Sequence, residues 1–248
     1  MKIVKATNID LSKITYSELK PYGDKAKIMY VNYESEPLHI DTRANMICPY
    51  GLSMFDNDGR KKYSLDLSFG NGDNTKVNEL KEALEKIDEK ILKDSTKNSL
   101  EWFKKKSQSK DVSKALYTSS IKIATENGEP TDKYPPTFKL KVPCYDGRFD
   151  KVQAYNEKKE RITEPLGDVI GKGQNVRAIV KLSGVWFAGG KFGVTWELSQ
   201  LKLTPRPKIK EYAFEDDDGD DDVSGEEDVS PKIGDGDEYV LDSEEDEL

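Results

Sequence analysis

The sequence is poor in the side chains that most often carry out chemistry in enzymes. It contains one histidine, His39, and two cysteines, Cys48 and Cys144, which are far apart and not in Cys-x-x-Cys spacing. This composition argues against a disulfide framework and against a zinc site, so we expect neither a metal nor a cofactor. A histidine general base would have to be His39, which lies in "PLHID" with no nucleophile motif nearby. We therefore expect a protein that is not an enzyme.

Long apolar runs and phosphate-binding loops are also missing. No stretch approaches the ~20 apolar residues of a membrane span, and the opening "MKIVKATNID" lacks the apolar core of a secretory signal. Neither "GKG" at Gly171 nor "GGK" at Gly189 fits the strand, glycine-rich loop and Lys-Ser/Thr of a phosphate loop, and both are typical of turns. We expect a soluble, intracellular protein without membrane contacts.

Positive and negative charges are unevenly distributed along the chain. The 39 Lys+Arg and 47 Asp+Glu give a net charge of −8. From Glu211 to Leu248 there are 19 acidic residues and one base, Lys232, so this segment carries −18 and residues 1–210 carry +10. A block of like charge with few apolar residues cannot offset the entropy lost on ordering. The sequence predicts a folded domain over residues 1–210 and a disordered acidic tail over residues 211–248.

Hydrophobic periodicity predicts strands, then a helical region, in the first half of the chain. "KAKIMYVNY" (25–33) and "KKYSLDLSF" (61–69) are rich in β-branched and aromatic residues, and the second alternates cleanly between apolar and polar positions. In "NTKVNELKEALEKIDEKILKD" the apolar residues recur at steps of three and four, which predicts an amphipathic helix capped by Asn74 and packed on the sheet. A shorter helical stretch is expected through "KNSLEWFKKK" (97–106).

Strand patterns resume after Tyr117 and continue to the end of the predicted domain. They occur in "YTSSIKIAT", "TFKLKVPCYDG", "RFDKVQAY", "NVRAIVKLSGVWFA" and "KFGVTWELSQLKL". The last two flank "GGK" and predict a long hairpin, after which Pro205 and Pro207 end the sheet. Six to eight strands with one helical excursion predict a mainly β fold, an OB-fold-like antiparallel barrel with an inserted amphipathic helix.

Cations and aromatic residues alternate with core positions on several of these strands. In "FKLKVPCY", Phe138, Leu140 and Val142 point to one side and Lys139 and Lys141 to the other. Interleaved cations and rings suit single-stranded nucleic acid, because cations follow phosphates and unstacked bases lie on rings. Solvated lysines and core aromatics are the alternative explanation. The candidate DNA-binding residues are Lys139, Lys141, Tyr145, Arg148, Lys151, Arg177, Lys181, Trp186, Phe187 and Lys191.

The acidic tail has an electrostatic role in this interpretation. A polyanion tethered to a positive domain is present near the groove at high effective concentration, so it competes with DNA and, when displaced, becomes free to recruit proteins. Tyr239, Leu241 and Leu248 could anchor the tail in a partner. The alternative is that the tail serves solubility alone.

The order of these features resembles the family of single-stranded DNA-binding proteins of T7-like phages and the related proteins of nucleocytoplasmic large DNA viruses. The resemblance is carried by "KYSLDLSFG", "FKLKVPCYDG", "GKGQNVRAIVKLSGVWFAGGKFGVTWELSQLKL" and the acidic tail. It implies an OB-fold, strand annealing and sequence-independent single-stranded DNA binding in viral replication, recombination and repair. It also implies a homodimer formed through the tail and tail contacts to the viral DNA polymerase and helicase-primase.

Residue by residue, the resemblance places Trp186 in an aromatic-rich hairpin segment and Lys139, Lys141 and Arg177 in the groove. The family's tail typically ends in an aromatic residue, whereas this chain ends in Leu248, which leaves the anchor open. The expected location is the site of viral DNA replication, in the nucleus or a cytoplasmic factory.

Two other functional classes remain open. An acidic-tailed, histone-chaperone-like binder of basic proteins would use the polyanion as its main surface and would not need a domain of charge +10. A virion structural protein would assemble with itself and be indifferent to DNA.

Overall fold

Five strands close into a barrel. A computed structural model describes residues 2–23, 25–57 and 59–205. The ring runs through β6 (Met46–Cys48), β8 (Arg60–Ser68), β13 (Thr137–Val142), β16 (Lys191–Thr204) and β15 (Gln174–Ala188), which pairs again with β6. The predicted mainly β, OB-fold-like barrel is confirmed. One pairing, β13 with β16, is parallel, which the antiparallel prediction did not include.

The closure of this barrel is uneven. The hairpin of β15 and β16 is paired from Asn175↔Thr204 to Ala188↔Lys191, and it turns on Gly189 and Gly190, whose φ values are 55° and 78°. Positive φ at both central residues is the geometry of a two-residue type I′ turn, so the hairpin predicted at "GGK" is confirmed. In contrast, β13 and β16 share a single register pair, Lys141↔Glu197. We call this short parallel junction the seam.

The predicted alternation of core and outward residues is also confirmed. Phe138, Leu140 and Val142 on β13 are buried, and so are Leu65 and Leu67 on β8. The same holds for the inward positions of β15, which are Val176, Ala178, Val180 and Leu182. Each strand therefore contributes one face to the core and leaves the other for the surface.

The long helix α1 (Thr75–Lys97) packs its apolar stripe on the core. The Asn74 side chain accepts from the backbone N–H groups of Lys76 and Val77, as expected for its N-cap. The buried apolar side chains of the stripe are Val77, Leu80, Ala83, Leu84, Ile87 and Ile91. The second predicted helix is present as α2 (Ser99–Phe103), whereas α3 (Lys110–Leu116) and α4 (Leu166–Val169) were not predicted.

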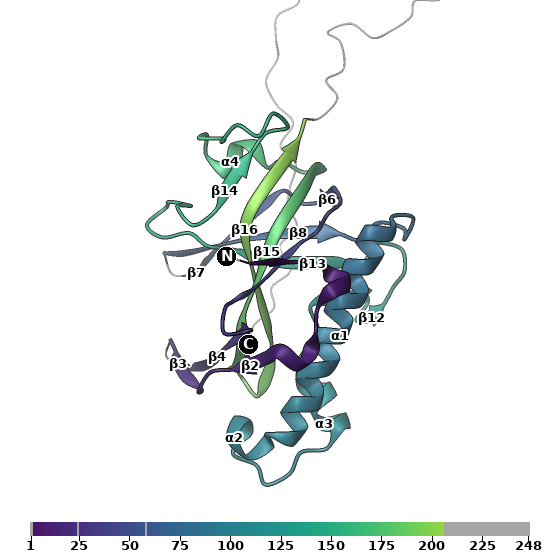
Figure 1. Ribbon diagram of the computed structural model, residues 1–248, viewed down its shortest axis with the longest axis vertical. Helices are drawn as coiled ribbons and strands as arrows, with labels where there is room; N and C mark the ends of the chain where they lie inside the picture. Colours follow the sequence, from purple (N-terminus) through teal and green to yellow (C-terminus); the bar gives the residue numbers. More distant parts are fainter. Residues whose placement is uncertain (1, 24, 58, 206–248) are drawn as a thin grey trace, which may run out of the picture. The chain divides into compact units, whose positions relative to one another are not determined.

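Several short strands were not predicted either. Besides β4 (Ala26–Tyr33), the N-terminal part contains β1 (Ile3–Val4), β2 (Ile14–Tyr16), β3 (Lys20–Tyr22), β5 (Leu38–Asp41) and β7 (Leu52–Asn57), with 3-10 turns at Ala6–Asn8 and Leu11–Lys13. Of the remaining strands, β9 (Tyr117–Thr118) and β10 (Ile121–Lys122) lie in the predicted "YTSSIKIAT" and β14 (Gln153–Tyr155) in the predicted "RFDKVQAY". The strands β11 (Thr125–Glu126) and β12 (Glu129–Pro130) were not predicted. In Figure 1, β3 and β7 project on the side of the barrel away from α1.

A buried carboxylate connects α1 to the segment that follows α3. Asp88 is 6% exposed and accepts four hydrogen bonds of 2.7 to 2.8 Å, from Tyr117 Oη, Ser119 Oγ and both the backbone N–H and Oγ of Ser120. Trp196 Nε1 in turn donates to Ser120 Oγ at 2.9 Å. The helix thereby fixes residues 117–120 against the barrel.

The predicted tail, its anchors Tyr239, Leu241 and Leu248, and the division at residue 210 lie outside the described residues and stay predictions. Within the described part of the chain, no helix is both long enough and apolar enough to cross a membrane.

Candidate nucleic-acid interface

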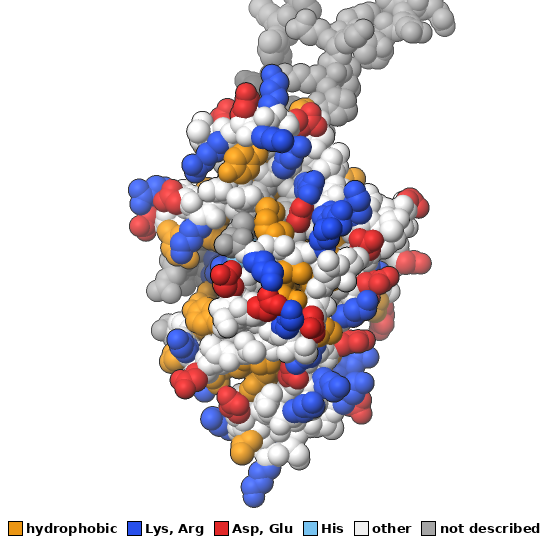
Figure 2. Space-filling model, in the orientation of Figure 1, with side chains coloured by type: hydrophobic (Ala, Val, Ile, Leu, Met, Phe, Trp, Pro, Cys, Tyr) orange, Lys and Arg blue, Asp and Glu red, His pale blue; other side chains and the backbone are white. Residues whose placement is uncertain are grey.

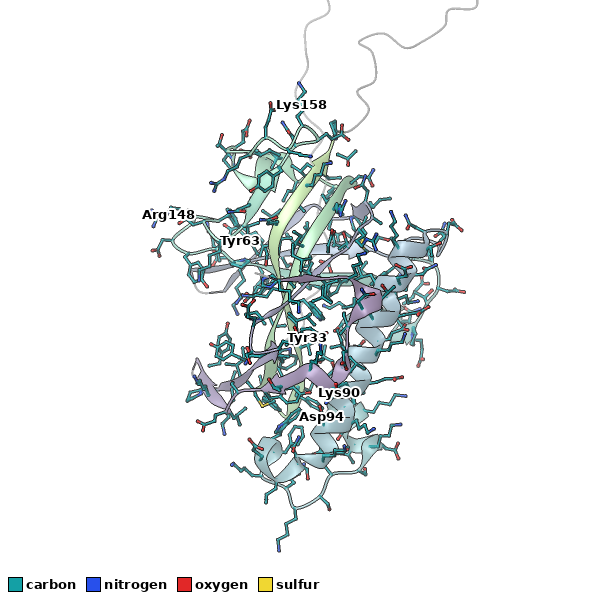
Figure 3. The ribbon with its side chains drawn as sticks, in the orientation of Figure 1. Tyr33, Tyr63, Lys90, Asp94, Arg148 and Lys158 are labelled. Atoms are coloured by element: carbon teal, nitrogen blue, oxygen red, sulfur yellow. The ribbon has the colours of Figure 1, made fainter. Side chains whose placement is uncertain are left out.

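A groove lies on the outer face of the barrel between two hairpins, β3–β4 and β7–β8. It consists of two hollows of about 700 and 410 Å³. The two hollows have in common Lys62, Tyr63, Lys141, Trp186 and Thr195, so they form one continuous groove. Tyr63, labelled in Figure 3, lies on β8 and belongs to this shared lining.

The lining of the groove is strongly cationic. It contains one carboxylate, Glu197, among the described residues, against seven lysines: Lys61, Lys62, Lys122, Lys139, Lys141, Lys151 and Lys181. Burial, together with the nearby charge of Lys139, lowers the pKa of Lys122. Two lysines that repel each other in this way favour an anion between or beside them.

Two of the seven lysines are held by Glu197. Glu197 Oε2 lies 2.6 Å from Lys181 Nζ, and Glu197 Oε1 lies 3.7 Å from Lys141 Nζ. Burial acts to raise the pKa of Glu197, but the hydrogen bond from Lys181 and the charges of both lysines outweigh it and lower that pKa. Burial acts to lower the pKa of Lys141. That pKa is nevertheless raised, because Lys141 Nζ donates to Tyr22 Oη at 3.2 Å and lies near the charge of Glu197. Glu197 thus orients both lysines in the free protein.

Aromatic rings are distributed along the same groove. Tyr22, Tyr30, Phe55 and Tyr145 are each 43% to 65% exposed, well above the exposure of core rings. Lys151 Nζ lies 4.5 Å from the centroid of the Tyr145 ring. Exposed rings beside cations provide surfaces on which unpaired bases can stack.

Trp186 is placed in the groove by a glycine on the next strand. It is half-buried, pairs with Gly193 across the hairpin and lines both hollows. A Cβ at Gly193 would lie 3.0 Å from Trp186 Cζ2 and 2.8 Å from the backbone oxygen of Thr118, so only glycine leaves room for the indole there. The ring therefore belongs to β15 itself, close to the hairpin turn at Gly189 and Gly190.

The structure brings six of the ten predicted residues together in the groove. These are Lys139, Lys141, Tyr145, Lys151, Lys181 and Trp186. Phe187 faces the other way and packs against Trp102, Phe103 and Phe192, with ring centroids 5.7 to 6.0 Å apart. Adjacent residues of a strand point to opposite faces, which explains why Trp186 and Phe187 separate.

Three predicted cations also lie outside the groove lining. Arg177 is held by Asp41, to which its Nε donates at 2.9 Å, in a separate small hollow. Arg148, labelled in Figure 3 on an outlying loop, pairs with Asp150 at 3.6 Å. Lys191 is exposed beside the hairpin turn.

Six exposed aromatic or cationic residues of the groove were not predicted from the sequence. They are Tyr22, Tyr30, Phe55, Lys61, Lys62 and Lys122. Lys62 was assigned to a polar strand face without a role, and the short β3 and β7 that carry Tyr22 and Phe55 have no clear alternation. The signal available was an aromatic residue beside charged ones, as in "LKPYG" and "MFDND".

The charge of the groove is not typical of the rest of the surface. On the face shown in Figure 2, acidic and basic side chains are mixed over most of the area. A larger hollow of about 850 Å³, next to the start of α1, is lined by Lys81 and Lys133 but also by Asp132, so its lining is nearly neutral. The described residues contain no cluster of side chains suited to a metal ion.

A family described as a family of unknown function (DUF5871) matches residues 66–216. The uncharacterized protein L291 of Acanthamoeba polyphaga mimivirus is 28% identical over 172 residues, which are 67% of this chain and 26% of that protein. The chain thus spans about a quarter of the length of this relative.

Among solved structures, the single-stranded DNA-binding protein from bacteriophage Enc34 in complex with ssDNA is similar with a TM-score of 0.43 and 14% identity, over 80% of this chain and 99% of that one. The single-stranded DNA-binding protein gp2.5 of bacteriophage T7 gives a TM-score of 0.42 and 14% identity, over 73% of this chain and 92% of that one. Likenesses at this level do not transfer a ligand from one protein to another.

Proposed function

Since the chain belongs to the family of unknown function DUF5871, its family supplies no activity, and we propose that it binds single-stranded DNA without sequence preference. The observation that carries the proposal is the groove, in which seven lysines and one carboxylate accompany exposed aromatic rings on the side of an OB-type barrel. In OB-folds, the face of the second and third strands and the loops beside it bind oligonucleotides. Here those two strands are β8 and β13.

The groove favours single strands over duplexes for a physical reason. Lysines neutralise phosphates of either form, so they alone do not discriminate. Rings such as Phe55 and Tyr145 gain stacking energy only from bases that are unpaired and turned out of a helix, because duplex bases are already stacked on each other. Stacking depends little on base identity, which makes the binding tolerant of sequence.

The wider role is part of the same proposal. We place the protein in the phage and viral single-stranded DNA-binding family that its sequence resembles, acting without catalysis in viral DNA replication, recombination and repair. The similarity to a mimivirus protein supports a viral setting. In this role the acidic segment 211–248 competes with DNA, recruits the viral polymerase and helicase-primase and mediates a homodimer at the site of replication.

Binding to single strands should weaken steeply with salt. Each neutralised phosphate contributes about −0.7 to the slope of log K against log salt, so seven lysines give at most about −5. The measurement is a fluorescence titration of one labelled oligonucleotide and of its duplex at several salt concentrations. Equal affinity for the two forms, or a flat salt dependence, would contradict the proposal.

Removal of residues 211–248 is expected to strengthen binding, most clearly at low salt. The deletion changes the net charge from −8 to +10 and removes a competitor whose effective concentration is in the millimolar range. Titrations of both forms at two salt concentrations, with their solution masses, test the competition and the dimer together. Weaker binding by the shortened chain would make the acidic segment part of the binding unit, and tight binding of histones by the full chain alone would favour a chaperone.

A further inference from the structure

The backbone register places the carboxylate of Glu197 in the larger hollow of the groove. Lys181 is its partner across the β15–β16 hairpin, and Lys141 is its partner across the seam. Both lysines therefore lie beside Glu197 as cross-strand neighbours, the arrangement in which opposite charges on one sheet face attract each other. The side chain of Glu197 is only 14% exposed, so it stays in the floor of the groove.

A fixed carboxylate in this place opposes the ligand that the groove attracts. It repels any phosphate that approaches it, and it offers Lys141 and Lys181 an anion that is already in position. A phosphate could replace that anion only by leaving a partly buried carboxylate without its partners, which is unfavourable. These two lysines are therefore poor phosphate contacts while Glu197 is ionised.

The other end of the groove has the opposite character. No salt bridge involves Lys62, Lys122 or Lys139 among the residues that the structure describes, although Asp66 is the cross-strand partner of Lys139 and its charge favours Lys122. The charges of Lys122 and Lys139 oppose each other. An incoming phosphate would relieve that repulsion at no cost to an existing pair. The lysines of the groove thus differ in how available they are, because Glu197 holds Lys141 and Lys181 and none of the others.

We propose that Glu197 acts as a built-in limit on affinity, which reserves Lys141 and Lys181 and leaves the phosphate path to the groove's other lysines, Lys62, Lys122 and Lys139 among them. This inference rests on the proposed binding of single-stranded DNA. On this arrangement the bases turn toward Trp186 and the paired end of the groove, and the protein releases a strand more readily than its seven lysines alone would allow.

The test compares Glu197→Gln with wild type in the full chain, using a labelled single-stranded oligonucleotide. Loss of the carboxylate charge frees up to two lysines, so the salt slope should steepen by about 0.7 for each, and binding at low salt should tighten about tenfold for each lysine that is freed. Glu85→Gln on α1 is the matched control, because it makes the same change of net charge at an exposed residue outside the groove lining. It should leave the slope unchanged.

Two lysine variants test the same inference without touching Glu197. Lys139→Met should make the slope shallower by about 0.7, whereas Lys181→Met should leave the slope as it is. The double variant Glu197→Gln with Lys181→Met should keep only the part of the increase in affinity that comes from Lys141. Thermal melting of each variant establishes that it is folded.

The possible outcomes separate this inference from the proposed function. If wild type does not bind the oligonucleotide, the proposed function itself fails. If wild type binds but Glu197→Gln behaves as Glu85→Gln, or binds more weakly while folded, then Glu197 does not limit affinity. A shallower slope for Lys181→Met would also overturn the inference, because Lys181 would then be a phosphate contact.

Discussion

Replacing Asp88 with alanine is expected to lower the free energy of unfolding by about 2–4 kcal/mol. The four hydrogen bonds that Asp88 accepts leave with it, and buried donors on Tyr117 and Ser120 lose their acceptor. Each buried donor left unsatisfied costs roughly 1–3 kcal/mol, less where water can enter. Urea unfolding of the purified variant measures the loss.

The exposed neighbour on the same helix provides the control. Glu89→Ala removes a carboxylate one residue away at an exposed position and should change stability by less than about 0.5 kcal/mol. The loss of Asp88 should also weaken DNA binding, because residues 118–120 line the groove and depend on Asp88 for their position. An Asp88→Ala variant as stable as wild type would show that this network does not hold the segment in place.

Replacing Trp186 with alanine is expected to weaken single-strand binding by about 1–3 kcal/mol. The indole lines both hollows, so a base stacked on it would lie at the centre of the groove. The ring is half-buried over Gly193, and we expect a smaller effect on stability than a core aromatic would give. Equilibrium titration and thermal melting of the same variant measure the two effects.

Phe187 is the matched comparison, one residue along the same strand. Its ring packs against Trp102, Phe103 and Phe192 on the opposite face, so Phe187→Ala should cost stability and leave binding largely intact. The pair of variants therefore separates the two faces of β15. If both variants lose stability alike and neither loses affinity beyond that, Trp186 is a core residue and not a stacking platform.

The parts of the fold that could be predicted are those fixed by local periodicity. The alternation of Phe138, Leu140 and Val142 with two lysines requires only that one face of the strand be buried, and the structure buries that face. The helix after Asn74 combines a strong cap with apolar residues at steps of three and four, both readable within one window. The hairpin at Gly189 was equally local, because its turn type demands glycine.

The parts that could not be predicted depend on long-range pairing. β6 is a strand of the barrel with three residues, too short to show alternation. Arg177 has the pattern of a free outward cation, yet Asp41 reaches it from a strand 136 residues earlier in the chain. Tyr22 and Phe55 join the groove from separate hairpins, so neither could be placed beside β13 before the topology was known.

The seam between β13 and β16 links occupancy of the groove to the integrity of the barrel. As at the junction of β6 and β8, the ring is held there by one register pair, whereas the adjoining β15–β16 hairpin is paired over most of its length, so the seam is a weak side of the barrel. That weak side lies under the groove, because the seam pair Lys141 and Glu197 lines it. A nucleic-acid strand bound as proposed would contact both strands of the seam, β13 and β16, and help to hold them together. Since a ligand that binds only the closed form stabilises it by mass action, the loaded protein would resist opening more than the free one.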